Sequence, residues 1–76
     1  MCSIIGYLGI NAAAPIIVKG LKRMEYRGYD SVGVATFSDN QIAVRKGVGK
    51  VLEVNNQAKL DQLTGNIGIG HTRWAT

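Results

Sequence analysis

The chain has 76 residues, which is enough for one small domain. A hydrophobic fraction of 46% and a charged fraction of 18% are typical of globular proteins and exclude an intrinsically disordered chain. The single cysteine, Cys2, cannot form an internal disulfide, so we expect a reducing, cytoplasmic location. The first apolar run is too short to span a bilayer and follows no basic segment, so we expect no membrane partner.

The net charge of +4 raises the question of a nucleic-acid partner. The nine Lys and Arg side chains are spread along the chain between acidic residues, without a basic run or an interleaved aromatic series. Scattered charges of this kind usually serve solubility and steering, so we expect no nucleic acid. A small basic nucleic-acid-binding module stays open as an alternative, and the salt dependence of binding would distinguish it.

The chain begins with an apolar run over residues 4–8 that predicts a buried strand. Residues 16–27 follow as an amphipathic helix, because Ile17, Leu21 and Met24 recur at helical spacing.

Three further residues bear on this helix. Pro15 suits its first turn, and Gly28 suits the position just past its end. Gly20 lies inside the helix, where glycine costs about 1 kcal/mol relative to alanine. We therefore expect Gly20 to mark the close approach of a neighbouring element.

The middle of the chain predicts an antiparallel hairpin. Residues 32–37 are rich in β-formers, residues 38–40 form a turn, and residues 41–46 alternate between polar and apolar types. Residues 47–50 read as a second turn. They do not form a P-loop, because the required preceding glycine and the following Ser or Thr are both missing.

The last third predicts one or two short helices over residues 51–63, with Leu52, Leu60 and Leu63 pointing inward. A strand over residues 67–71 follows, and its glycines permit tight packing. The order β-α-β-β-(α)-β predicts an α+β fold with an antiparallel sheet and helix on at least one face. The residues after this strand, 72–76, are expected in a loop.

Cys2 is the first candidate for chemistry. If Met1 is removed, Cys2 carries a thiol and a free α-amine at the mouth of the first strand. The amine can accept the thiol proton, directly or through water, as in enzymes with an N-terminal threonine nucleophile. The alternative is an inert, buried cysteine, which is the commoner case for a lone Cys.

Arg73 is the second candidate, with Thr72 and Thr76 beside it. A guanidinium group holds a carboxylate by two parallel hydrogen bonds, and a hydroxyl can add a third, which would suit an amino-acid substrate. The alternative for Arg73 is an ordinary surface arginine. Trp74 is either a lid over a ligand or part of the core.

Arg27 and Gly28 form a third candidate at the helix end, where Arg27 either neutralises helix carbonyls or favours the thiolate nearby. A triad of Asp30, Ser31 and His71 is disfavoured, because neighbours in a strand point to opposite faces. No second His or Cys cluster offers a metal site, and no cofactor is predicted.

Three segments together resemble a known family. They are Met1-Cys2 with IIG at residues 4–6, YRGYDS at residues 26–31 with Gly33, and GHTRWAT at residues 70–76. They resemble the glutaminase domain of the glutamine–fructose-6-phosphate aminotransferase (isomerizing) family, also called the glucosamine-6-phosphate synthases. The resemblance extends over essentially all 76 residues. It implies that residues 1–76 are the N-terminal part of a type 2 glutamine amidotransferase domain, an αββα sandwich of the N-terminal-nucleophile hydrolase type.

The resemblance also implies a reaction. Cys2, exposed by loss of Met1, attacks the side-chain amide of glutamine, ammonia leaves, and water releases glutamate from a γ-glutamyl thioester. In the whole enzyme, which is expected to be a homodimer, ammonia passes to a C-terminal sugar-isomerase domain. There it converts fructose 6-phosphate to glucosamine 6-phosphate.

The substrate-binding residues follow by position. Arg73 would hold the α-carboxylate of glutamine with help from Thr76. Trp74 would belong to the loop that closes over the substrate, and the wall near the nucleophile would be lined by Arg27 and Gly28.

Two departures from the family pattern matter. Ser3 stands where the family usually has glycine, so crowding at the nucleophile is expected to reduce activity. The 76 residues also end before the Asn-Gly pair that forms the family's oxyanion hole and before the aspartate that binds the substrate amine. We therefore expect these residues to be inactive alone. Another amidotransferase of the class, such as amidophosphoribosyltransferase, is the alternative.

Overall fold

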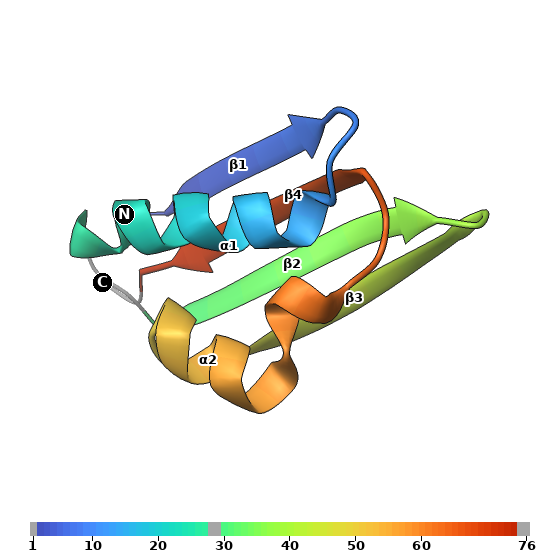
Figure 1. The fold of residues 1–76 in the computed structure, drawn as a ribbon. Coiled ribbons are helices and arrows are strands. Elements are labelled where there is room, and N and C mark those ends of the chain that lie inside the picture. The colour runs from blue at the N-terminus through green and yellow to red at the C-terminus, as the bar shows by residue number, and fades with distance from the viewer. Residues whose placement is uncertain (1, 28–29, 75–76) are drawn as a thin grey trace.

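The computed structural model describes residues 2–27 and 30–74 (Figure 1). Within them the predicted order β-α-β-β-(α)-β is confirmed. The strands are β1 (Ser3–Leu8), β2 (Ser31–Ser38), β3 (Gln41–Val48) and β4 (Ile67–Arg73). The helices are α1 (Ala13–Met24) and α2 (Val51–Ala58), each followed by a short 3₁₀ turn, Glu25–Arg27 and Leu60–Gln62.

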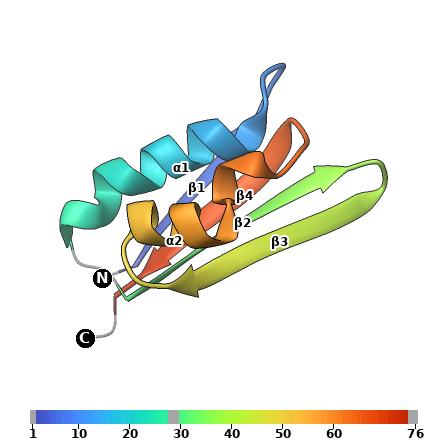
Figure 2. The ribbon, with the colours of Figure 1, turned by 60° about the horizontal axis from the view of Figure 1, so that its bottom comes forward.

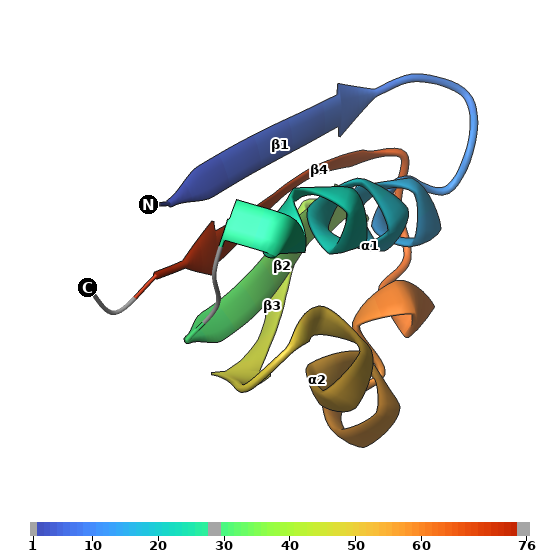
Figure 3. The same ribbon diagram turned by 90° about the vertical axis from the view of Figure 1, so that its left-hand side faces the viewer.

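The four strands form one antiparallel sheet in the order β1-β4-β2-β3. The first and last strands of the described chain therefore lie side by side, with Ser3 opposite Thr72. Both helices lie on the same side of the sheet, so the molecule has two layers (Figures 2 and 3). This arrangement confirms the expected α+β class and leaves the other face of the sheet without a covering layer in the described residues.

The core forms where α1 presses on the central strand β4. Ile17 and Leu21 are fully buried there, as predicted. They occupy the space above Gly68 and Gly70, where an added Cβ would overlap them. The predicted role of these glycines in tight packing is confirmed.

Gly20 of α1 likewise permits close packing, in this case between α1 and the neighbouring strand β1. A Cβ at Gly20 would overlap Ile5 Cδ1 of β1, so the predicted close approach of a neighbouring element is also confirmed. The helix begins three residues earlier than predicted, at Ala13, and Pro15 lies in its first turn.

The first strand is half-buried rather than buried. Its residues alternate, and Ile5 and Tyr7 pack against the core while Ile4 and Leu8 point to the uncovered face. Ile4 keeps 78% of its surface exposed. The prediction of a buried strand was wrong because both faces of β1 are apolar, whereas only one of them is covered in the described residues.

The second helical segment confirms the prediction of short helices and corrects one residue. Leu60 and Leu63 are buried as expected, but Leu52 is exposed. Val51 and Val54 fill the place expected for Leu52, because they lie one helical turn apart on the face toward the sheet.

The two strands of the hairpin and the last strand are each longer than predicted. Asp39 and Asn40 have φ values of 53° and 62°, which is the two-residue type I′ turn that suits a tight hairpin. Gly47 continues β3 in place of the predicted turn, paired with Val32. Thr72 and Arg73 belong to β4 instead of to a loop, because they continue the antiparallel pairing with β2.

Two carboxylates satisfy the N-terminus of α2. Glu25, just past α1, accepts a hydrogen bond from the Val51 N–H, and Glu53 accepts one from the Lys50 N–H at 3.0 Å. A helix N-terminus carries unpaired N–H groups and partial positive charge, so both contacts stabilise α2. The bond from Glu25 also ties the end of α1 to the start of α2.

The uncovered face of the sheet is apolar, and we call it the open face. Strand alternation places on it Ile4, Leu8, Phe37, Ile42, Val44, Val48, Ile67 and Ile69, all of them substantially exposed. An exposed apolar patch of this extent marks a surface that packs against something else. Among the described residues no helix has the length and hydropathy that crossing a bilayer requires.

Candidate active site

The candidate residues gather at one end of the sheet. Cys2 precedes β1, Asp30 precedes β2, and Arg73 ends β4. Figure 1 shows the start of β1, the end of β4 and the start of β2 at the same end of the sheet. Two pairs fix this placement, because Ser3 lies opposite Thr72 and Arg73 lies opposite Ser31.

Cys2 is exposed and has a free thiol. Cys2 is therefore not buried in the described structure, whereas its reactivity stays a prediction. The register sets Cys2 one step beyond the pair of Ser3 and Thr72, next to Arg73 on the neighbouring strand. By alternation it belongs to the same face as Ile4, which is the open face.

Ser3 lies on the opposite side of the strand from the cysteine. It is buried on the helix-covered face together with Thr72, its partner in β4. Its backbone also avoids the left-handed region, since Ser3 is not among the described non-glycine residues with positive φ. The expected crowding of Cys2 by the Ser3 side chain therefore has no support in the geometry.

Arg73 presents its guanidinium group at this end of the sheet. Its side chain is 66% exposed, and Nη1 lies 3.9 Å from Oδ2 of Asp30. The backbone of Arg73 is held in the sheet by pairing with Ser31 of β2, whereas its side chain reaches solvent. A carboxylate could therefore reach the remaining donors of the guanidinium fork.

Asp30 is the functional candidate that sequence reasoning missed. The sequence places it only beside Ser31, in a triad that was disfavoured. Its pairing with Arg73 depends on register across 42 intervening positions, which no local pattern shows. Since Asp30 faces Arg73, it is not available to orient His71, which lies opposite Gly33. The triad is not formed.

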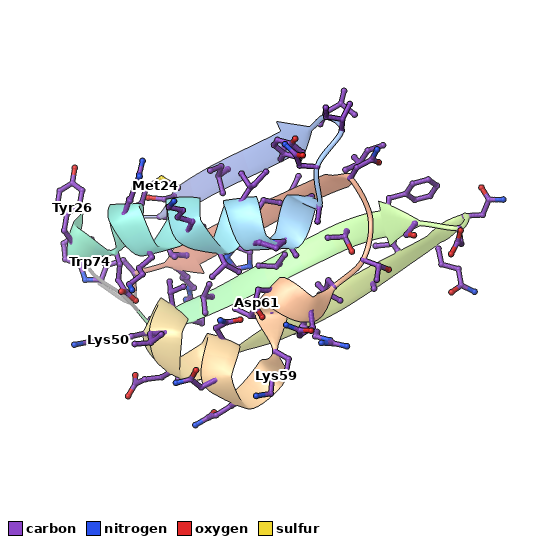
Figure 4. The ribbon with its side chains drawn as sticks, in the orientation of Figure 1. Met24, Tyr26, Lys50, Lys59, Asp61 and Trp74 are labelled. Atoms are coloured by element: carbon purple, nitrogen blue, oxygen red, sulfur yellow. The ribbon has the colours of Figure 1, made fainter. Side chains whose placement is uncertain are left out.

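Trp74 follows Arg73 directly and is 39% exposed, so it is neither fully core nor fully free. Figure 4 places its ring at the same end of the molecule as Tyr26, beyond the end of α1. This position beside Arg73 is compatible with the predicted contact with a substrate.

Three predicted positions lie wholly or partly outside the described residues. Gly28 and Thr76 are not described, and of Arg27 only the backbone is described, at the end of the 3₁₀ turn that follows α1. That turn lies at the same end of the sheet as the start of β1 (Figure 1).

His71 lies on the open face, opposite Ile4 on one side and Gly33 on the other. With Lys46 it borders a shallow apolar hollow whose floor includes Gly33, where an added Cβ would come 3.1 Å from His71 Nε2. The described residues contain no group of three His, Cys, Asp or Glu side chains that could hold a metal ion.

Comparison with known proteins finds similar sequences among the aminotransferases. The chain is 57% identical over its whole length to a glutamine–fructose-6-phosphate aminotransferase (isomerizing) from Pyrococcus horikoshii, and 58% identical to one from Methanococcus maripaludis. A third, from Bacteroides thetaiotaomicron, is 57% identical. The chain matches the N-terminal part of the glutamine–fructose-6-phosphate aminotransferases. It spans only 12–13% of the length of these aminotransferases, and no family model matches it.

Solved structures confirm the fold. The allosteric regulatory enzyme of purine biosynthesis matches the whole chain with a TM-score of 0.88 and 29% identity. The glutamine phosphoribosylpyrophosphate amidotransferase from B. subtilis, complexed with ADP and GMP, matches 99% of it with the same TM-score and 28% identity. The described chain covers 16% of each of those proteins. The fold is therefore that of amidotransferases of the N-terminal-nucleophile type, while the sequence is nearer to the aminotransferases.

Proposed function

We propose that residues 1–76 form the N-terminal part of the glutaminase domain of an aminotransferase that makes glucosamine 6-phosphate from fructose 6-phosphate and glutamine. The supporting observation is the identity of 57–58% over the whole chain, combined with the meeting of Cys2 and Arg73 at one end of the sheet. We call the longer protein that would carry this segment the full-length protein. Its action would be cytoplasmic, as a homodimer with a sugar-isomerase domain.

Cys2 supplies the nucleophile after removal of Met1. Its α-amine takes the thiol proton, and sulfur forms a bond to the amide carbon of glutamine. The carbon–nitrogen bond then breaks, and the proton leaves with ammonia. Water attacks the resulting thioester, glutamate departs, and a proton from that water passes to sulfur. An exposed thiol at the end of a strand is accessible to a substrate amide, as this chemistry requires.

Arg73 recognises the substrate. Its guanidinium group lies on the strand next to Cys2, so one glutamine molecule could span the two groups. Paired hydrogen bonds from Arg to the α-carboxylate hold the amino acid at one end, while the side-chain amide reaches sulfur at the other. Trp74 and Thr76 would close over the bound molecule, and Arg27 and Gly28 would line the wall near sulfur.

The open face receives the second sheet of the domain. An αββα sandwich buries one face of each sheet against the other and covers each outer face with helices. In the described chain, helices cover one face and the other is apolar and exposed, as the first half of such a sandwich requires.

The test uses the full-length protein and two nitrogen donors. Replacement of Cys2 by alanine should abolish synthesis of glucosamine 6-phosphate from glutamine, since removing a nucleophile commonly costs several orders of magnitude. Synthesis from added ammonia should continue, because the sugar-isomerase domain is unchanged. The matched control is Ser38→Ala, at the far end of the sheet, which should retain both activities. Full glutamine-dependent synthesis by the Cys2→Ala protein would refute the proposal.

The structural neighbours favour one alternative acceptor. Because the solved structures that match the fold are purine-pathway amidotransferases, the same segment could deliver ammonia to phosphoribosyl pyrophosphate. Assay of the full-length protein with each acceptor decides between them. We expect product from fructose 6-phosphate, in agreement with the higher identity to the aminotransferases.

A further inference from the structure

We propose that Asp30 is a positioning residue for Arg73, holding its guanidinium group ready for the carboxylate of an amino-acid substrate. This inference rests on the proposed function. The observation behind it is the approach of Arg73 Nη1 to Asp30 Oδ2 at 3.9 Å, at the end of the sheet where Cys2 lies.

Asp30 is the fixed member of the pair. Its carbonyl oxygen accepts a hydrogen bond from the Gly49 N–H at 2.9 Å, which anchors the start of β2 to the end of β3. Gly49 has a φ of 128°, a conformation that favours glycine, so this turn is specified by the sequence. The Asp30 side chain is also only 33% exposed, half the value for Arg73.

Arg73 is the member that needs positioning. Its side chain is long and largely exposed, so without a partner it would sample many rotamers. A nearby carboxylate narrows that range before the substrate arrives and thereby reduces the entropy lost on binding. The approach to Asp30 involves one terminal nitrogen of Arg73, which leaves the other donors of the guanidinium group for the substrate.

The ion pair between Asp30 and Arg73 is not explained by a contribution to folding stability alone. The two groups are partly exposed and 3.9 Å apart, and pairs of this kind contribute little to folding. Removal of the Asp30 charge should therefore change substrate binding while leaving the fold intact. The α-carboxylate takes no part in bond making, so the loss should raise the KM for glutamine and leave kcat nearly unchanged.

The experiment compares Asp30→Asn with Asp39→Asn in the full-length protein. Asp39 lies in the hairpin turn at the far end of β2, where φ is positive and asparagine is well tolerated, so this variant is the matched control. We expect Asp30→Asn to raise the KM for glutamine roughly three- to tenfold, with kcat and the thermal unfolding midpoint nearly unchanged. Asp39→Asn should leave all three values as they are.

A double variant separates positioning from an independent effect. In an Arg73→Gln background, Asp30→Asn should raise the KM no further, because the group it positions is gone. Equal KM values for Asp30→Asn and Asp39→Asn, or effects of Asp30→Asn and Arg73→Gln that multiply, would overturn the inference. If Cys2→Ala and Arg73→Gln both left glutamine-dependent synthesis intact, the proposed function itself would fail.

Discussion

Gly70 of β4 lies directly beneath Ile17 of α1, with no room for a side chain between them. A Cβ built on Gly70 would overlap Ile17 Cγ2 and come 2.9 Å from Leu21 Cδ1. Both helix residues are fully buried, so neither can swing into solvent to make space. The distance between α1 and the central strand is therefore set by the absence of a side chain at this position.

Gly70→Ala should destabilise the protein by about 1–3 kcal/mol, as overpacking of a well-filled core usually does. Urea unfolding followed by far-UV circular dichroism would measure the change. Gly6→Ala is the control, because its added Cβ would meet nothing closer than 3.8 Å. Equal stability of the two variants would show that α1 moves away from the sheet at little cost.

Thr36→Val should stabilise the protein. Thr36 is buried in β2, and its hydroxyl oxygen has no hydrogen-bond partner among the described residues. Valine has nearly the same shape and removes the buried polar group, so we expect a gain of about 1 kcal/mol in the free energy of unfolding. Thr36→Ser keeps the hydroxyl and loses a methyl group, so it should destabilise. A loss of stability in the valine variant would mean that the hydroxyl is hydrogen-bonded in solution.

Ile69→Thr should act in opposite directions in two forms of the protein. Residues 1–76 alone expose Ile69 on the open face, so threonine should raise solubility, as measured by light scattering against concentration. In the full-length protein the second sheet would cover this position, and the change should cost about 1–2 kcal/mol of stability.

The control for this comparison is the same substitution away from the sheet. Ile10 is 94% exposed in the loop between β1 and α1, so Ile10→Thr should leave the stability of the full-length protein nearly unchanged. If Ile69→Thr were equally harmless there, the open face would not be buried in the full-length protein.

Ser3→Gly should leave glutamine hydrolysis by the full-length protein close to its original rate. The Ser3 side chain is buried on the helix-covered face, away from the face of Cys2. Glycine inside a strand should instead lower stability, by about 0.5–1 kcal/mol. A large increase in kcat on this substitution would show that the hydroxymethyl group does crowd the nucleophile.

Most of the fold could be predicted from local patterns. The helical spacing of Ile17 and Leu21 identified the buried face of α1, and Gly20 correctly indicated a close contact. The apolar character of β1 and the burial of Leu52 were misjudged. Both errors have one cause, since hydrophobic residues alone do not tell which surface is covered by the described chain and which is not.

The site was predicted less completely, because it depends on register. Cys2 and Arg73 were candidates from their chemistry, and the resemblance to a family gave them specific roles. The structure brings them to one end of the sheet. Their neighbour Asp30 was not linked to Arg73, since only the pairing of Ser31 with Arg73 places the two charges together. The role of every site residue stays a prediction, namely those of Cys2, Arg73, Trp74, Thr76, Arg27 and Gly28.

The strand that carries the thiol is an outer one. In the described chain β1 is hydrogen-bonded only to β4, while β4 and β2 are each held on both sides. Peripheral strands open at lower free energy than central ones. On mild heating β1 should therefore separate from β4 while the central strands are still paired. The thiol of Cys2, next to β1, would then lose its position, so glutaminase activity would be lost below the temperature of global unfolding.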